Sequence, residues 1–184
     1  MATASILQEP VRPLRRVEYD KLVEAGVFED ERVELLYGII IRMSPIGPPH
    51  ASAVAALNEL LILRLAGRAS VRVQSSIAAS DDSQPEPDVA VVPRNNYRQA
   101  HPSDALLIIE VADSSLTKDR GIKAKLYAEC GVPEYWVVNV RDDLVEVHTE
   151  IVGGAYTRVE PHRPGSRIRL TAFPDVEIDV RDIL

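Results

Sequence analysis

The sequence predicts a mixed α/β fold (α+β mixed), in which a largely buried sheet is flanked by helices and extended by β-hairpins. Two apolar runs of strand length, residues 87–92 and 106–111, are bounded by clusters of Pro, Asn and Ser, as buried strands are. A strand, a helix and a strand follow one another over residues 106–140, which is the order of a right-handed crossover between parallel strands. Alternating side chains around Gly153-Gly154 indicate a hairpin, and residues 167–180 add short alternating strands.

The chain is expected to form one domain behind a short arm. Its 184 residues, 46% hydrophobic and 27% charged, are typical of a folded domain with a single core. Residues 1–16 contain prolines and show no periodicity, so they predict a flexible N-terminal arm before a single domain of residues 17–184. The sequence shows no signal peptide and no apolar run of roughly 20 residues, and its only cysteine is Cys130. These features predict a cytoplasmic protein.

Helix and strand patterns alternate along the first half of the chain. Residues 17–26 predict a short helix, and residues 32–43 predict two strands joined by a bend at Gly38. Apolar residues three and four positions apart predict a core-facing helix over residues 50–66. Strict alternation predicts a half-buried strand over residues 71–77.

The two apolar runs each contain one acid. Asp88 opens its strand, and Glu110 nearly closes the next one. If these strands are antiparallel neighbours, the two carboxylates lie at the same end of the sheet. Carboxylates that converge in a buried place repel each other unless a cation compensates them, and Mg²⁺ is an ion that prefers such oxygen ligands. The pattern therefore predicts a site for Mg²⁺ (or Mn²⁺) at this end of the sheet.

A helix that carries lysines is expected beside this site. Residues 119–130 predict a helix that crosses one face of the sheet, with its N-terminal half near Glu110. Lys123, or Lys125 as the second choice, could then reach the carboxylates. Lys123 also stands four residues after Asp119, so a simple ion pair between those two residues explains the spacing equally well.

Two further residues are candidates for the site. Glu34 lies among apolar neighbours in a predicted strand, where it is either a third carboxylate of the site or a side chain that faces solvent. His50 lies in the first turn of a predicted helix, where it is either a base or phosphate contact, or a capping residue at the surface. The 4 histidines of the chain lack the spacing of zinc ligands.

Two carboxylates and an ammonium at one end of a sheet suit metal-assisted hydrolysis of a phosphodiester. A metal binds the phosphate oxygen and lowers the pKa of a bound water, while a lysine positions that water or offsets negative charge. The sequence contains no glycine-rich phosphate loop, dinucleotide fingerprint or nucleophile elbow. Its net charge of −7 argues against a protein that coats nucleic acid through its overall field.

Several segments of the chain carry a resemblance to a known family. The most specific one is Gly131-Val132-Pro133-Glu134-Tyr135-Trp136. The others are residues 32–38, Met43-Ser44-Pro45 with His50, Pro87-Asp88-Val89, Glu110-Val111, and Asp119 with Lys123 and Tyr127. Together they resemble the Uma-type family of putative restriction endonucleases, within the PD-(D/E)XK nuclease superfamily, and the resemblance covers residues 17–182.

The resemblance implies a restriction-endonuclease-like core that acts on DNA. It implies that Mg²⁺ is held by Asp88, Glu110 and the main-chain carbonyl of Val111. It also implies that Glu34 is an acid supplied by the N-terminal part, and that the catalytic ammonium is Lys123 on the helix.

The chain departs from the superfamily pattern at one position. The superfamily lysine normally stands two positions after the glutamate, where this chain has Ala112. The expected catalytic residues are Glu34, Asp88, Glu110 and Lys123, and the expected substrate contacts are His50 and Lys125.

We therefore expect an Mg²⁺-dependent endonuclease that works as a homodimer, because two sites related by a two-fold axis can cut both strands of DNA. Two alternatives remain open. One is a non-catalytic DNA-binding or regulatory domain, which Ala112 and the acidic net charge favour. The other is a metal-dependent phosphohydrolase that acts on small nucleotides in a closed pocket.

Overall fold

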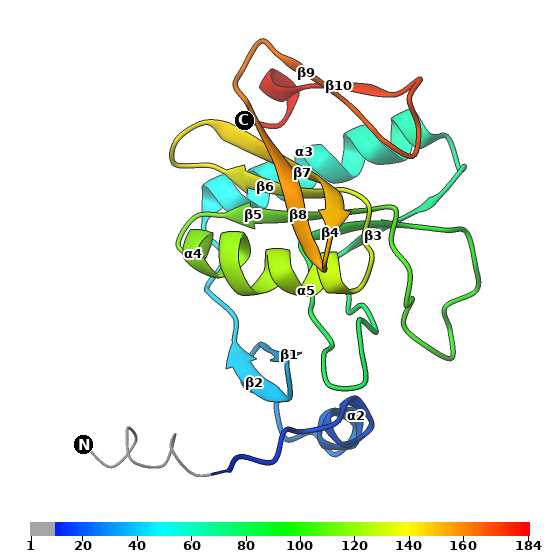
Figure 1. Cartoon of the computed structure of the whole chain (residues 1–184), viewed down its shortest axis with the longest axis vertical. Helices are drawn as coiled ribbons and strands as arrows, with labels where there is room; N and C mark the ends of the chain where they lie inside the picture. The colour runs from blue at the N-terminus through cyan, green and yellow to red at the C-terminus, as the bar shows by residue number, and fades with distance from the viewer. Residues whose placement is uncertain (1–9) are drawn as a thin grey trace.

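The computed structural model describes residues 10–184 and consists of a central sheet with helices on both faces (Figure 1). The six strands of this sheet lie in the order β3-β4-β5-β6-β7-β8. β5 and β6 are parallel, and the other neighbouring strands of this sheet are antiparallel. The predicted mixed sheet is thus confirmed. Its strands are β3 (Ser70–Val73), β4 (Val89–Val92), β5 (Leu107–Ala112), β6 (Tyr135–Asn139), β7 (Leu144–Val152) and β8 (Ala155–His162).

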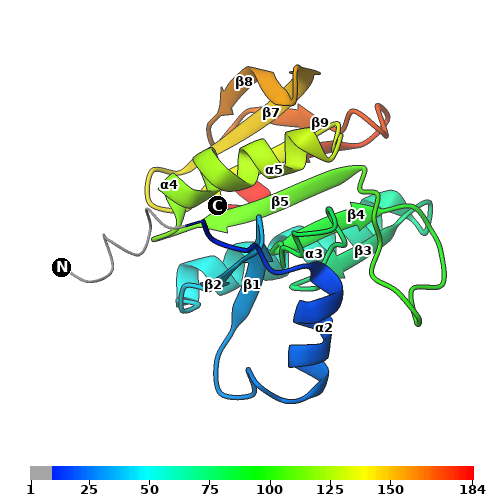
Figure 2. The same cartoon turned by 60° about the horizontal axis from the view of Figure 1, so that its bottom comes forward.

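Different helices cover the two faces of the sheet. α3 (Pro48–Leu65) buries Leu57 in the same core as Ile109 of β5. α5 (Ala124–Glu129) buries Tyr127 in a second core on the other face, and Figure 2 shows α3 and α5 on opposite sides of β5. No helix within residues 10–184 is long and apolar enough to cross a membrane.

The helical crossover from β5 to β6 begins earlier than the sequence predicts. It starts with α4 (Leu116–Lys118), continues through a π-helical turn, η1 (Asp119–Lys123), and ends with α5. The parallel pairing of the two strands, in which Glu110 lies opposite Val137, confirms the predicted crossover. Only the helix start was wrong, because the turn formers that precede the helix conceal its first residues.

The N-terminal part contains α2 (Arg16–Glu24) and an antiparallel hairpin of β1 (Val33–Leu36) and β2 (Ile39–Arg42). The hydroxyl of Tyr19 donates a hydrogen bond to the carbonyl of Val33 at 3.0 Å, which fixes α2 to the hairpin. The helix, the two strands and the bend between them agree with the sequence pattern.

Most of the predicted N-terminal arm, residues 1–16, lies outside the described residues. The described end of that segment rests against the hairpin. The main-chain N–H of Leu14 donates a hydrogen bond to the carbonyl of Gly38 at 2.9 Å, and a Cβ at Gly38 would overlap Pro13. Gly38 also has a positive φ of 74°, so the bend suits glycine for both reasons.

The C-terminal strands β9 (Arg167–Arg169) and β10 (Glu177–Asp179) form a separate two-stranded sheet, followed by the 3₁₀ turn η2 (Val180–Asp182). This small sheet covers the core on the α3 side. Buried Glu134 holds it there, since its carboxylate accepts hydrogen bonds from the indole of Trp136 at 2.8 Å and from the main chain of Thr171 at 2.7 Å.

The burial of His148 makes the stability of the fold depend on pH. This β7 side chain is buried between Tyr135 and Tyr156, and its Nε2 has no hydrogen-bond partner among the described residues. Burial lowers its pKa below 6.5, partly opposed by Glu146. The unfolded chain therefore takes up the proton first, so the free energy of unfolding should be unaffected above pH 6.5 and decrease as the pH falls below it.

Replacing His148 with phenylalanine keeps an aromatic ring and removes the titrating group. Below pH 6.5 the free energy of unfolding should decrease more steeply in the wild type than in the variant. The difference between the two slopes should be at most about 1.4 kcal/mol per pH unit. Urea denaturation between pH 7.5 and 5 measures this difference. If the free energy of unfolding depended on pH in the same way in both proteins, His148 would not be the group that causes the decrease. His162→Phe serves as the control.

Candidate active site

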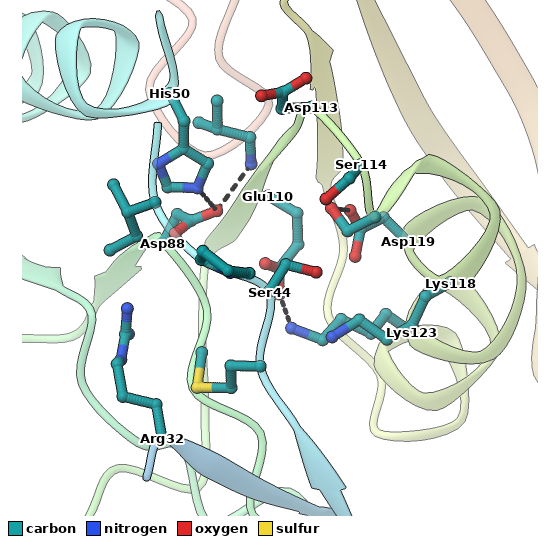
Figure 3. Close-up of a pocket in the computed structure, with 15 residues that line it drawn as sticks. Arg32, Ser44, His50, Asp88, Glu110, Asp113, Ser114, Lys118, Asp119 and Lys123 are labelled. Carbon is teal, nitrogen blue, oxygen red and sulfur yellow. Dashed lines mark hydrogen bonds and ion pairs between the residues drawn. The ribbon is translucent and has the colours of Figure 1, made fainter. Parts of the chain in front are cut away.

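Asp88 and Glu110 lie opposite each other at one end of the central sheet. The antiparallel register pairs Val89 with Ile109, so the next pair outward is Asp88 with Glu110. Both side chains line a cavity of about 40 Å³, which has room for an ion and a few waters. Figure 3 shows them between His50 and the helix that carries the lysines. The predicted antiparallel pairing, which brings the two acids to one end of the sheet, is confirmed.

Asp88 is held through one of its two carboxylate oxygens. Its Oδ2 accepts a hydrogen bond from the main-chain N–H of Val111 at 2.8 Å and lies 3.0 Å from Nε2 of His50. Because a carboxylate oxygen accepts hydrogen bonds, this contact favours the tautomer in which Nε2 of His50 carries the proton and donates it. Nδ1 of His50 is buried without a hydrogen-bond partner among the described residues. Oδ1 of Asp88 accepts no hydrogen bond from residues 10–184 and remains available at the cavity.

Glu110, like Asp88, is held through only one of its two carboxylate oxygens. Its Oε1 accepts hydrogen bonds from Nζ of Lys123 at 2.8 Å and from the hydroxyl of Tyr127 at 2.7 Å. Its Oε2 accepts no hydrogen bond from the described part of the chain. Burial raises the pKa of Glu110 above its ordinary value, although the ammonium of Lys123 opposes the rise. A cation bound at the cavity would favour the ionised carboxylate.

Lys123 is a buried ammonium between two acids. Its Nζ lies 2.8 Å from Glu110 and 3.0 Å from Oε2 of Glu34, and only 2% of its side chain is exposed. Burial alone would lower the pKa of Lys123, but the carboxylates of Glu110 and Glu34 outweigh this effect and raise it above the ordinary value. The side chain is therefore charged at neutral pH.

Glu34 comes from β1 and is fully buried. Its Oε1 accepts a hydrogen bond from Nζ of Lys118 at 2.8 Å, and its Oε2 pairs with Lys123. Burial would raise the pKa of Glu34, but the two ammonium groups lower it below the ordinary value. Of the two interpretations of Glu34, the structure excludes the one in which the side chain faces solvent. The two ammonium groups occupy both of its oxygens.

The π-helical turn η1 directs both of its terminal residues toward the sheet. Asp119 and Lys123, the first and last residues of this turn, are both buried. A π-helical turn has more residues per turn than an α-helix, so its side chains do not follow the α-helical spacing. Asp119 accepts a hydrogen bond from Ser115, and burial raises its pKa. Lys123 makes its ion pairs with acids of two strands and not with Asp119, so the simple pair that the spacing allowed is not formed.

Lys125 does not reach the site. It extends from the opposite side of α5, where its Nζ lies 3.7 Å from Glu129 and over the ring of Tyr37. Its side chain is 65% exposed. Of the two lysines that the sequence offered, Lys123 is the one that reaches the carboxylates, because two residues of helix turn Lys125 away from the cavity. A substrate contact by Lys125 outside this cavity stays a prediction.

Lys118 belongs to the site but was missed in the sequence. It lines the cavity and pairs with Oε1 of Glu34, whereas Lys123 pairs with Oε2. The one signal for it was its place in a basic cluster shortly after Glu110, which is also typical of a solvated helix face. The other lining residues that sequence analysis did not single out for the site are Arg32, Met43, Ser44, Pro45, Ile46, Asp113, Ser114 and Ser115.

The donor atoms at the cavity fit a hard divalent cation. Asp88 and Glu110 each leave one oxygen without a partner in the described residues, and Val111 lines the same cavity. Within residues 10–184 no group of three His, Cys, Asp or Glu side chains is arranged as a metal site. Mg²⁺ is commonly bound through one or two carboxylates and several waters. Two carboxylates and a main-chain carbonyl are therefore enough protein ligands for this ion.

Comparisons with known proteins give a family and a similar fold. A family model described as "Putative restriction endonuclease" (Uma2) matches residues 16–181. No functionally curated protein matches the chain. Among solved structures, a putative nuclease belonging to DUF820 from Anabaena variabilis ATCC 29413 is similar, with a TM-score of 0.72 and 16% identity. The alignment covers 93% of this chain and 97% of that one, so the two proteins share a fold.

Proposed function

The chain belongs to the Uma2 family of putative restriction endonucleases, and from that premise we propose that it is a metal-dependent endonuclease that hydrolyses phosphodiester bonds of DNA. One observation supports this proposal above the others. Within residues 10–184 each of the two acids keeps one carboxylate oxygen without a hydrogen-bond partner at a common cavity, while a buried and charged lysine contacts Glu110. This is the combination of groups that phosphodiester hydrolysis with a metal ion requires.

Each residue has a distinct role in the proposal. Asp88, Glu110 and the carbonyl of Val111 would hold Mg²⁺ or Mn²⁺. When bound, the ion supplies a Lewis acid for the phosphate and lowers the pKa of a water. The ammonium of Lys123 offsets negative charge that develops on the phosphate. His50 orients Asp88 through its Nε2, so it acts on the acid and not on the substrate.

Glu34 is assigned a positioning role. Both of its oxygens face ammonium groups, which leaves no free oxygen for a metal ion. Its negative charge keeps Lys123 protonated, which burial alone would oppose. Glu34 thereby supports the reaction from β1 without touching the reacting atoms.

A non-catalytic DNA-binding or regulatory domain is the second candidate. Ala112 stands where the superfamily lysine is expected, and the net charge is −7. The structure offers a replacement for the missing ammonium, since Lys123 lies 2.8 Å from Glu110. This distance is the reason to favour an enzyme, and a homodimer would suit cleavage of both strands.

Removal of the metal tests the enzyme directly. Supercoiled plasmid and single-stranded DNA should be cleaved with Mg²⁺ or Mn²⁺, and cleavage should stop with EDTA and return when the ion is added in excess. The reason is that neither carboxylate can polarise the phosphate without the cation. Gel electrophoresis of the products measures the effect.

Glu110→Gln provides the control for contaminating nucleases. This variant keeps the size of the side chain but removes its charge, and it should be inactive under all metal conditions. Cleavage that persists in EDTA, or equal cleavage by wild type and Glu110→Gln, would refute the proposed function.

A further inference from the structure

A second pocket opens directly beside the catalytic cavity. It has a volume of about 460 Å³ and shares Ser44, Ser114, Ser115 and Lys118 with the cavity. Arg42 at the end of β2, Thr117 and Ile122 complete its lining. A chain-like substrate that occupies the cavity could therefore continue into this pocket without leaving the surface.

The lining of the second pocket is acid-free. It has two cationic side chains and four hydroxyl groups. The catalytic cavity, by contrast, contains Asp88, Glu110, Asp113 and Asp119. The pocket beside β9 and β10 also contains arginines, but it combines them with Asp175, Glu177, Asp179 and Asp182. In a chain with a net charge of −7, a pocket with cations and no acids suits an anion.

Arg42 and three of the four hydroxyl groups of this pocket are available to a ligand, whereas Lys118 pairs with Glu34 and Ser115 donates a hydrogen bond to Asp119. The side chain of Arg42 is 82% exposed, and its ion pair with Glu31, at 3.2 Å, is of the exposed kind that contributes little. The hydroxyls of Ser44, Ser114 and Thr117 form no hydrogen bond with residues 10–184. A phosphate accepts hydrogen bonds from both guanidinium and hydroxyl groups.

We propose that this pocket binds a second phosphate of the same nucleic-acid strand, next to the phosphate that is hydrolysed. The inference rests on the proposed function, because it takes the catalytic cavity as the position of the scissile phosphate. Arg42 is the main contact, with Lys118 at the boundary between the two pockets. The preferred substrate then has at least two consecutive phosphodiesters, which a small nucleotide lacks.

Arg42→Gln tests the second phosphate site. Two substrates are compared: a ten-nucleotide single-stranded DNA and bis(p-nitrophenyl) phosphate, which has only one phosphodiester. The variant should raise KM for the oligonucleotide about three- to tenfold, as expected for the loss of one charge-assisted contact, and leave kcat unchanged. Hydrolysis of the small ester should not change, because it cannot fill both pockets.

Arg158→Gln is the matched control, since Arg158 is an exposed arginine on β8 that also pairs with acids. If the wild type cleaves the oligonucleotide and both variants have the same KM, the second phosphate site is refuted while the proposed function stands. The site is also refuted if Arg42→Gln weakens hydrolysis of the small ester as much as that of the oligonucleotide.

A binding measurement separates the inference from the proposed function. Fluorescence anisotropy of the labelled oligonucleotide at several salt concentrations gives the slope of log K against log salt. Arg42→Gln should reduce this slope by about 0.7, the value for one phosphate contact on a single strand. If the wild type cleaves neither substrate but Arg42→Gln still reduces the slope, the second phosphate site is supported and the proposed endonuclease function is refuted. An unchanged slope refutes the phosphate site.

Discussion

Replacing Lys123 with methionine is expected to lower the free energy of unfolding by about 3 to 5 kcal/mol, as is usual when one partner of a buried ion pair is removed. Nζ of Lys123 lies within 3.0 Å of both Glu34 and Glu110. Its loss leaves Glu110 without an ammonium, so this acid would hold its proton more strongly. Glu34 would keep only Lys118. Urea denaturation at pH 7.5 measures the change.

Lys125→Met is the control, because Lys125 is on the same helix but is exposed. This substitution should change the free energy of unfolding by no more than about 0.5 kcal/mol. The double variant Lys123→Met/Glu34→Gln should recover part of the stability, since it removes one of the two acids left behind. If Lys123→Met were as stable as Lys125→Met, the buried charge network would not exist in solution.

Asp88→Asn is expected to reduce the rate of DNA cleavage by at least about 100-fold, which corresponds to a loss of at least about 2.7 kcal/mol of electrostatic stabilisation by the metal. Asparagine has the same shape as aspartate, and its amide oxygen can still accept the hydrogen bond from Val111. The fold should therefore persist while the site loses the charge that attracts the ion. Initial rates of plasmid nicking at saturating Mg²⁺ measure the loss.

Asp175→Asn makes the same chemical change on a side chain that is 67% exposed and distant from the cavity. It should cleave at the wild-type rate. Circular dichroism of both variants checks that each is folded. Wild-type activity in a folded Asp88→Asn protein would show that the metal, if any, is held elsewhere.

The position of the two acids could be predicted from the sequence because strands have a simple geometry. The apolar runs before and after residues 93–104 were long enough for strands, and an antiparallel pair necessarily brings Asp88 at the start of one beside Glu110 at the end of the other. The parallel crossover then placed the helix with Lys123 above Glu110. Local patterns were sufficient for each of these steps.

The environment of Glu34 could not be predicted in this way. All four residues of β1 are buried, so the strand lacks the alternation that would show which way Glu34 points. Its partner Lys118 lies 84 residues later in the chain, in a helix whose start was predicted too late. The choice between Lys123 and Lys125 depended on the exact phase of this helix, which contains a π-helical turn.

The hairpin of β1 and β2 makes the N-terminal part a member of the charge network around the cavity. β1 supplies Glu34 to the lysines, and β2 ends at Arg42 beside the second pocket. A chain shortened to begin at α3 would retain Asp88 and Glu110 at the cavity, yet it would leave the ammonium groups of Lys118 and Lys123 without Glu34, the acid that both of them contact. The central sheet with its crossover helix and the N-terminal hairpin are thus a single electrostatic unit, and neither part balances its charges alone.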